Sequence, residues 1–363
     1  MIGDAPPFTG WHNEPGYDDE PPPARQLAQP RTWQPVDLGP VLDGTYNPPQ
    51  PTVGARSDGT GILYPGRQHT IASESEAGKS WFALNIAAAE LDRGGAVVYI
   101  DFEDDEGGIA GRLLALQVNK TAIRERFSYH RPEAPIFDIV NRSDLAQAVG
   151  DLRPTLAVID GVTEGMVLHG LDPLSNKDAA TFGRTLLGWI AQAGPAVASL
   201  DHVTKSADGR GRYALGAVHK LNGLNGAAYI LEQRVAFGIG IKGKSTVRLA
   251  KDRPGQLRRH GLPHTSGMHW FGDLVLDSHD ETFAELELVA PTIRSDDWRP
   301  TELMRRICEA LTKHGDLSQR RIMAAVPGGS EMKRSALDFL ILDGYVTEKT
   351  PHKLVKPYDG ASE

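Results

Sequence analysis

Residues 72–81 of the chain read ASESEAGKSW and end in the Gly-Lys-Ser sequence that closes a phosphate-binding loop. Backbone N–H groups in such a loop face phosphate oxygens, and the helix that follows adds the positive end of its dipole. Lys79 can reach the β- and γ-phosphates of a nucleotide, and the Ser80 hydroxyl can ligate Mg²⁺. The segment therefore predicts a site for ATP and Mg²⁺ made by Ser73, Glu74, Ser75, Glu76, Ala77, Gly78, Lys79, Ser80 and Trp81.

The first position of this loop is Ser73, where such loops normally carry glycine. This position mainly serves the curvature of the loop, so serine costs backbone freedom but removes no phosphate ligand. A β-rich segment precedes the loop, and a helix with apolar residues at Phe82, Leu84 and Ile86 follows it, as the mechanism requires. We expect a working nucleotide site; the alternatives are a chance Gly-Lys-Ser or a decayed loop.

Two acidic residues at the ends of buried strands complete the predicted chemistry. Glu103, in YIDFEDD, could polarise the water that attacks the γ-phosphate. The alternative is that Glu103, Asp104 and Asp105 all cap the next helix, where acids are favoured. We assign Glu103 to catalysis and the other two to capping. Asp160 ends the strand LAVID and is expected to hold Mg²⁺ through water.

Later strands end in a histidine and in cations. His202, in SLDHVTK, could sense the γ-phosphate; a structural histidine is the alternative. Lys251 and Arg253 lie two apart in LAKDRPG at a strand end, where both point the same way. They could neutralise charge at a neighbouring subunit's γ-phosphate, or be a surface pair without a role. With Lys79 and Glu103, these three residues form the predicted catalytic set.

A glycine-rich segment after His202 carries several cations. Flexible cationic loops suit the phosphodiester backbone of a nucleic acid, where contacts are electrostatic and independent of sequence. A solvated loop without a ligand is the alternative. The predicted nucleic-acid-binding residues of this segment are Lys205, Arg210, Arg212 and Lys220.

These residues need a framework that brings strand ends together. Between residues 53 and 290, short apolar segments alternate with amphipathic helices, which predicts a parallel sheet covered on both faces. In such a doubly wound α/β fold the ligand crevice lies at the carboxyl ends of the strands. The segments GIGIKGKSTVRLAKDRPG and FGDLVLD are expected to form antiparallel strands at the sheet edge.

Two further regions flank this core. Residues 1–52 contain twelve prolines and few aliphatic residues, which predicts a disordered or extended arm. Residues 291–363 form a linker and a small unit in which three helices precede a hairpin, the order of a winged helix.

Composition narrows the class of protein further. The net charge of −8 argues against a strongly basic nucleic-acid binder but permits a local basic patch. The single cysteine, Cys308, excludes an intramolecular disulfide and a cysteine-ligated zinc site. The sequence has no signal peptide and no apolar run of ~20 residues. We expect a soluble, cytoplasmic protein without membrane contact.

The ordered segments SESEAGKSW, YIDFEDD, VIDG, DHVTK with GRGRYALG, and AKDRPG resemble the RecA/DnaB-like P-loop ATPases, in particular RepA-type hexameric helicases. The resemblance covers residues 36–290. It implies a RecA-like core, ATP at subunit interfaces, and a ring or filament around nucleic acid. It also implies Mg²⁺ on Ser80 and Asp160, Glu103 as the catalytic glutamate and His202 as the sensor. Lys251 and Arg253 would act in trans.

Three functions follow from these observations. The first is an ATP-hydrolysing, DNA-associated oligomer, a helicase or translocase in DNA replication. It would act on single-stranded DNA as a homo-oligomer, expected to be a hexamer, with replication or recombination proteins as further partners. The second is a RecA-like recombination or repair ATPase. The third is an ATP-gated DNA-binding regulator that uses the winged helix to find a duplex site.

Overall fold

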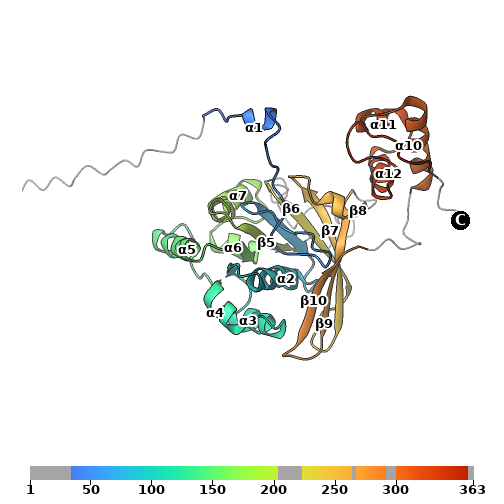
Figure 1. Ribbon diagram of the computed structural model, residues 1–363. Helices are drawn as coiled ribbons and strands as arrows, with labels where there is room; N and C mark the ends of the chain where they lie inside the picture. The colour runs from blue at the N-terminus through green and yellow to red at the C-terminus, as the bar shows by residue number, and fades with distance from the viewer. Residues whose placement is uncertain (1–33, 203–222, 264–266, 292–299, 359–363) are drawn as a thin grey trace, which may run out of the picture. The chain divides into compact units, whose positions relative to one another are not determined.

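A computed structural model describes residues 34–202, 223–263, 267–291 and 300–358. Its centre is a ten-stranded mixed sheet with the order β10-β9-β7-β6-β1-β5-β4-β2-β3, and β8 pairs with β9 (Figure 1). The six neighbouring strands from β6 to β3 run parallel to one another. The remaining strands pair antiparallel at one edge. This is the predicted doubly wound, mainly parallel α/β fold.

The strands are β1 (Gln68–Ser73), β2 (Val97–Asp101), β3 (Phe127–His130), β4 (Leu156–Asp160), β5 (Ala196–His202), β6 (Ala227–Val235), β7 (Lys242–Asp252), β8 (Leu262–Pro263), β9 (His269–Ser278) and β10 (Ala284–Val289). The helices of the core are α2 (Lys79–Asp92), α3 (Glu106–Ala115), α4 (Lys120–Arg126), α5 (Ile139–Leu152), α6 (Val162–Leu168), α7 (Asn176–Phe182), a π-helix (Gly183–Gly188), α8 (Trp189–Gln192) and a 3-10 turn (Arg258–His260).

Helices cover both faces of the parallel part of the sheet (Figure 1). All residues of β2 and of β4 are buried, as expected for strands covered on both sides. Their side chains alternate between two cores. Val97 and Tyr99 pack with residues of α2 and α3, whereas Val98 and Ile100 pack with residues of α5 to α8. Because β1, β2, β4 and β5 run parallel to one another, their carboxyl ends meet at one edge of the sheet.

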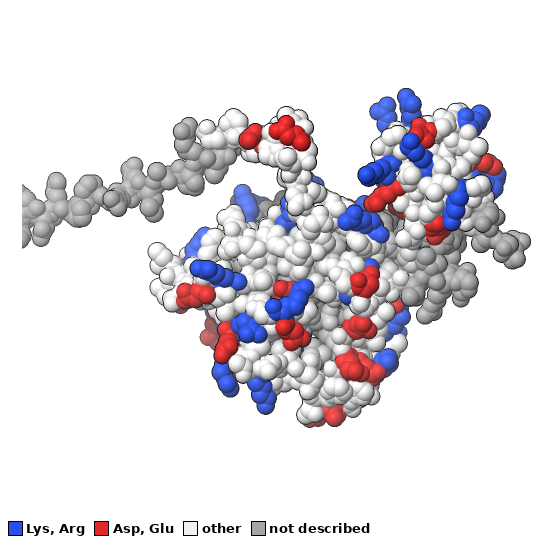
Figure 2. Space-filling model, in the orientation of Figure 1, with Lys and Arg blue, Asp and Glu red and all other residues white. Residues whose placement is uncertain are grey.

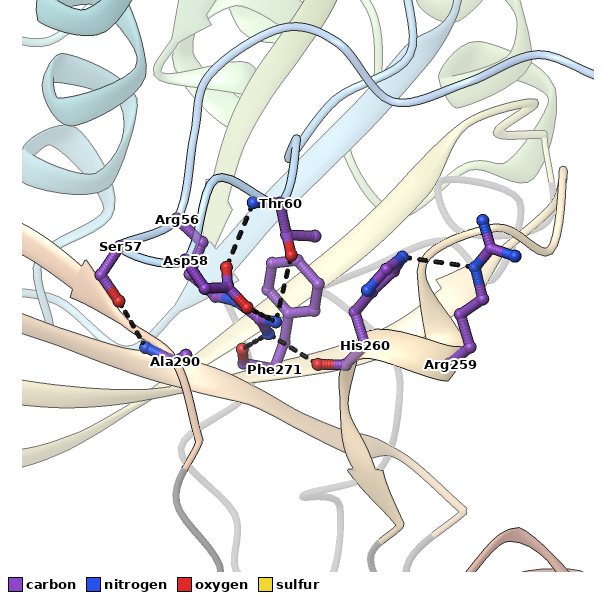
Figure 3. A network of polar contacts seen from close by, with 8 residues as sticks. All are labelled: Arg56, Ser57, Asp58, Thr60, Arg259, His260, Phe271 and Ala290. Carbon is purple, nitrogen blue, oxygen red and sulfur yellow. Dashed lines mark hydrogen bonds and ion pairs between the residues drawn. The ribbon is translucent and has the colours of Figure 1, made fainter. Parts of the chain in front are cut away.

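The segment before β1 is attached to the antiparallel edge by a buried arginine (Figure 3). Arg56 is 5% exposed, and its guanidinium donates to the carbonyls of His260 (2.7 Å) and Phe271 (2.6 Å). The same group pairs with Asp58 (2.6 Å) and lies over the Phe271 ring at 4.8 Å. The Arg56 guanidinium holds the pKa of Asp58 well below its usual range. These contacts fix the chain that leads into β1 against the strands that follow β7.

Two other parts of the chain are described separately. Residues 34–47 contain a four-residue helix, α1 (Gly39–Leu42), inside the segment predicted as an arm. The C-terminal residues form α10 (Thr301–His314), α11 (Gln319–Ala325) and α12 (Ser330–Leu342) around a core of their own. Two antiparallel bridges, Leu317 with His352 and Val346 with Leu354, complete this unit. The assignment of a winged helix stays a prediction.

Across the described residues, no helix has both the length and the apolar character needed to cross a membrane.

Candidate nucleotide site

The phosphate loop connects β1 to α2 and contains two residues in the left-handed region. Glu76 has φ of 62° and Gly78 has φ of 91°. Ser73 is fully buried, lies outside that region, and its Oγ donates to the carbonyl of Glu74 at 2.6 Å. The tight curvature of this loop therefore falls at Glu76 and Gly78. Because Ser73 needs no positive φ, serine replaces the usual glycine here without backbone strain.

Strands β6 and β7 brace the outer side of this loop. Gln233 Nε2 donates to the carbonyl of Glu76 (3.0 Å), and Ser245 Oγ donates to the carbonyl of the next residue (2.8 Å). The Phe237 ring packs against Gly78 so closely that a Cβ at position 78 would lie 2.7 Å from it. Gly78 is thus required twice, by its positive φ and by this aromatic ring. The loop is preformed by contacts that are distant in sequence.

Ser80 and Asp160 form the part of the site that could hold Mg²⁺. Ser80 Oγ donates to Asp160 Oδ2 at 3.0 Å, and the Tyr99 hydroxyl donates to the same oxygen at 2.6 Å. Asp160 is 3% exposed, and burial raises its pKa. A hydroxyl and a carboxylate fit Mg²⁺, which takes few protein oxygens and completes its shell with phosphates and water. The described residues hold no cluster of three His, Cys, Asp or Glu side chains that could bind a metal by themselves.

Lys79, His202 and Glu103 lie in a row beside this pair. Lys79 Nζ is 3.3 Å from His202 Nδ1, and His202 Nε2 is 3.4 Å from Glu103 Oε1. Lys79 is 8% exposed; burial lowers its pKa, and the charge of Glu103 opposes that shift. The structure therefore brings the predicted phosphate ligand, sensor and base to one place. The three side chains contact one another in the order Lys79, His202, Glu103.

The backbone around Glu103 is held by a buried carboxylate. Asp101 Oδ1 accepts hydrogen bonds from the N–H groups of Glu103 (2.9 Å) and Asp104 (3.0 Å). The predicted capping role fits Asp105, whose side chain accepts from Gly108 N at the start of α3 (2.8 Å). Asp104 pairs with Arg112 at 3.2 Å and thus also contacts α3. Glu103 is left as the acid that faces the site.

Glu164, in the first turn of α6, is a residue of this site that sequence reasoning missed. Burial, followed by a hydrogen bond to Glu164 and the charge of Glu164, raises the pKa of Glu103 to about 8. Gly161 makes room for this arrangement, because a Cβ there would lie 2.7 Å from Glu103 Cγ. The only available signal was the position of Glu164, four residues after Asp160 on the helix that leaves β4.

Lys251 and Arg253 lie near the level at which β1 begins, whereas the phosphate loop follows the end of β1. Lys251 pairs with Ala228, which is level with Thr70 of β1, whereas the phosphate loop begins after Ser73. Three residues of strand separate the two levels by about 10 Å. Lys251 Nζ donates to the carbonyl of Leu224 at 3.0 Å, and burial lowers its pKa. The structure does not place either cation at the phosphate loop of its own chain.

The predicted nucleic-acid-binding residues lie outside the described part of the chain: Lys205, Arg210, Arg212 and Lys220.

Part of the chain is similar to a known protein family. Residues 34–208, slightly less than half of the 363-residue chain, match a protein-family model described as an AAA domain. Among solved structures, the chain is similar to a KaiC-like protein from the hyperthermophilic archaeon Pyrococcus horikoshii. The identity is 10% and the TM-score is 0.46, over 66% of this chain and 99% of that one. The curated proteins contain no match.

The AAA-domain match and the phosphate loop support the P-loop ATPase superfamily. Residues 34–208 are thus similar to an AAA domain, and the phosphate loop among them lies on a mainly parallel α/β sheet.

Proposed function

We propose that this chain is an ATP-hydrolysing motor that works on DNA as an oligomer, of the RepA/DnaB-like helicase or translocase type. The observation that carries the proposal is the separation of two sets of charges on one sheet. Lys79, Glu103 and His202 lie at the carboxyl edge of the parallel strands, and Lys251 and Arg253 lie at the other end of the neighbouring strands. Copies arranged head to tail would bring the second set of one chain to the first set of the next.

In this proposal each residue at the site has one task. Lys79 leaves His202 and binds the β- and γ-phosphates, and the amide groups of the loop hold the same oxygens. Glu103 accepts a proton from the attacking water, and its 3.4 Å contact with His202 keeps it near the place of the γ-phosphate. Mg²⁺, held by Ser80 and Asp160, would supply positive charge to the phosphate oxygens. Arg253 of a neighbour would neutralise the charge that develops during transfer.

His202 would couple this chemistry to nucleic acid. It ends β5, and the cationic segment with Lys205, Arg210, Arg212 and Lys220 follows it directly in the sequence. A shift of His202 on nucleotide binding would therefore act on the first residues of that segment. Single-stranded DNA is the proposed ligand, because contacts to a phosphodiester backbone are electrostatic and do not depend on the base sequence.

A DNA-binding role for the C-terminal unit is the second candidate. Figure 2 shows Lys and Arg side chains gathered on this unit. Arg320, Arg321 and Arg334 are exposed, on α11 and α12. Lys333 does not belong to this set, because it is buried and donates to the carbonyls at the end of α11, at Met323 (2.6 Å) and Val326 (2.9 Å). The three arginines would bind duplex DNA in an ATP-gated regulator.

The test is the ATPase rate with and without single-stranded DNA, with light scattering in the same buffer. We expect stimulation by DNA and a particle of about six times 39.4 kDa. Lys79→Ala should abolish turnover, and Glu103→Gln should keep ATP bound without hydrolysis. A monomer whose turnover ignores single-stranded DNA would refute the motor. A footprint on duplex DNA that needs Arg320, Arg321 and Arg334 would then favour the regulator.

A further inference from the structure

One carboxylate fixes the backbone of the loop that follows β7 and carries Arg253. The side chain of Asp252 accepts hydrogen bonds from the N–H groups of Gly255 (3.0 Å), Leu257 (2.8 Å) and Arg258 (3.2 Å). On the other side, the N–H of Arg253 donates to the carbonyl of Gly226 at 3.0 Å. The loop is therefore tied down both at its start and along its length.

A buried tyrosine from another part of the chain holds Asp252 in turn. The Tyr64 hydroxyl donates to Asp252 Oδ1 at 2.8 Å and accepts from Gln256 N at 3.1 Å. Tyr64 has no exposed surface and stacks on His69, with ring centroids 6.0 Å apart. Burial and the bond to Asp252 raise the pKa of Tyr64, so its hydroxyl remains a donor. The loop is thus anchored in the core next to β1.

These hydrogen bonds hold the backbone of the loop and leave the side chain of Arg253 exposed. Among the described residues this side chain forms no ion pair. Arg234, another exposed arginine on the same hairpin, is paired with Glu232 at 2.6 Å. A fixed backbone reduces the conformational entropy that Arg253 would lose on binding a phosphate. Such a loop is suited to present a cation to an anion outside its own chain.

We propose that Asp252, held by Tyr64, is the positioning residue that presents Arg253 to the γ-phosphate bound by a second copy of the chain. This rests on the proposed function, because it needs a neighbour's nucleotide at the interface. Asp252 and Tyr64 act on turnover only through the position of Arg253.

The first experiment measures kcat, KM and the affinity for a fluorescent ATP analogue in three variants. In Asp252→Asn, one acceptor oxygen of the carboxylate is lost, and in Tyr64→Phe only the hydroxyl is lost. Both should lower kcat at least tenfold, and analogue affinity should change less than twofold because the phosphate loop is untouched. Arg253→Ala should lower kcat further. Thermal unfolding of each variant identifies any loss of fold.

The matched control is Asp280→Asn, the same change at another loop-ordering aspartate. Asp280 accepts from Thr282 and Phe283 in the turn between β9 and β10, at 2.7 and 3.0 Å. This variant should keep the wild-type kcat. A loss equal to that of Asp252→Asn would show a general effect of loop disorder and would overturn the proposal.

Mixing of subunits supplies the readout that a merely structural role would not change. Lys79→Ala subunits cannot hydrolyse ATP but carry an intact Arg253, so adding them to Asp252→Asn or Tyr64→Phe subunits should restore turnover severalfold. Wild-type kcat in these two variants, with Arg253→Ala impaired, would overturn the positioning role alone. Wild-type kcat in Arg253→Ala would instead refute the contribution in trans and the proposed function with it.

Discussion

The ionisation of Glu103 gives the sharpest prediction for the nucleotide site. A general base must be deprotonated, yet partial burial and Glu164 raise the pKa of Glu103 to about 8. At pH 7 only about one tenth of Glu103 would then be ionised, against about nine tenths at pH 9. Because kcat/KM reports the ionisation of the free enzyme, it should rise about tenfold over this range.

The pKa of Glu103 can be changed by Glu164→Gln, which removes the charge next to Glu103 and keeps the size of the side chain at position 164 nearly unchanged. The pKa of Glu103 should fall, because Glu164 contributes to its upward shift through both a hydrogen bond and its charge. Well below the pKa, each unit of decrease raises the ionised fraction about tenfold. The rising limb of the kcat/KM profile should therefore move to lower pH, and the gain in the variant should be largest near pH 6.

The assay is the ATPase rate between pH 6 and pH 9.5 at saturating Mg²⁺ and constant ionic strength. Burial lowers the pKa of Lys79, so any falling limb at high pH reports the lysine and not Glu103. Glu106→Gln, on an exposed residue of α3, is the control for a general change in charge and should keep the wild-type profile. A flat wild-type profile, or a profile that Glu164→Gln leaves in place, would refute the reasoning.

Three further predictions concern Ser80 as a Mg²⁺ ligand, the contact of Phe237 with the phosphate loop, and the hydrogen bonds of Arg56. Ser80→Ala should raise the Mg²⁺ concentration for half-maximal activity at least tenfold; an unchanged Mg²⁺ titration would exclude Ser80 as a ligand. Phe237→Ala removes the ring that packs against Gly78 and should weaken nucleotide binding about tenfold. If titration of a fluorescent nucleotide gives the same affinity for the variant and the wild type, the Phe237 ring does not support the phosphate loop. Arg56→Ala leaves two carbonyls without their donor and should lower the free energy of unfolding by about 3 kcal/mol in urea. Arg234→Ala, at an exposed ion pair, is its control and should cost at most about 1 kcal/mol; equal losses would contradict a structural role of the Arg56 network.

The sequence predicted the elements whose signals are local. The helix expected after the phosphate loop is α2 (Lys79–Asp92), and the three apolar segments before Glu103, Asp160 and His202 are β2, β4 and β5. Continuous burial on both faces makes such strands almost uniformly apolar, so they are visible without knowledge of their neighbours. The capping role of Asp105 was likewise visible, because a cap depends on residues within one turn.

Other parts of the site had no local signal. The strand β6 was not predicted, although it lies beside β1 and supplies Gln233 to the phosphate loop. Glu164 looks like any acid in a first helical turn until Gly161 and the end of β2 place Glu103 against it. Tyr64 and Asp252 are 188 positions apart and meet only in the folded chain. Contacts of this kind depend on strand order, which no window of sequence contains.

By itself, the sequence determined the class of chemistry at this site. A lysine and a serine after glycine, and acids after buried strands, fix which groups can bind phosphate and Mg²⁺, because these abilities belong to the side chains and to the loop that carries them. Only the tertiary structure decided how those groups act together. Partial burial beside Glu164 raises the pKa of Glu103, and β7 runs away from the phosphate loop, which places Arg253 far from the phosphate loop of its own chain. The charges around a side chain and the direction of a strand relative to its neighbours depend on how the strands pack, so both are decided only when the sheet forms.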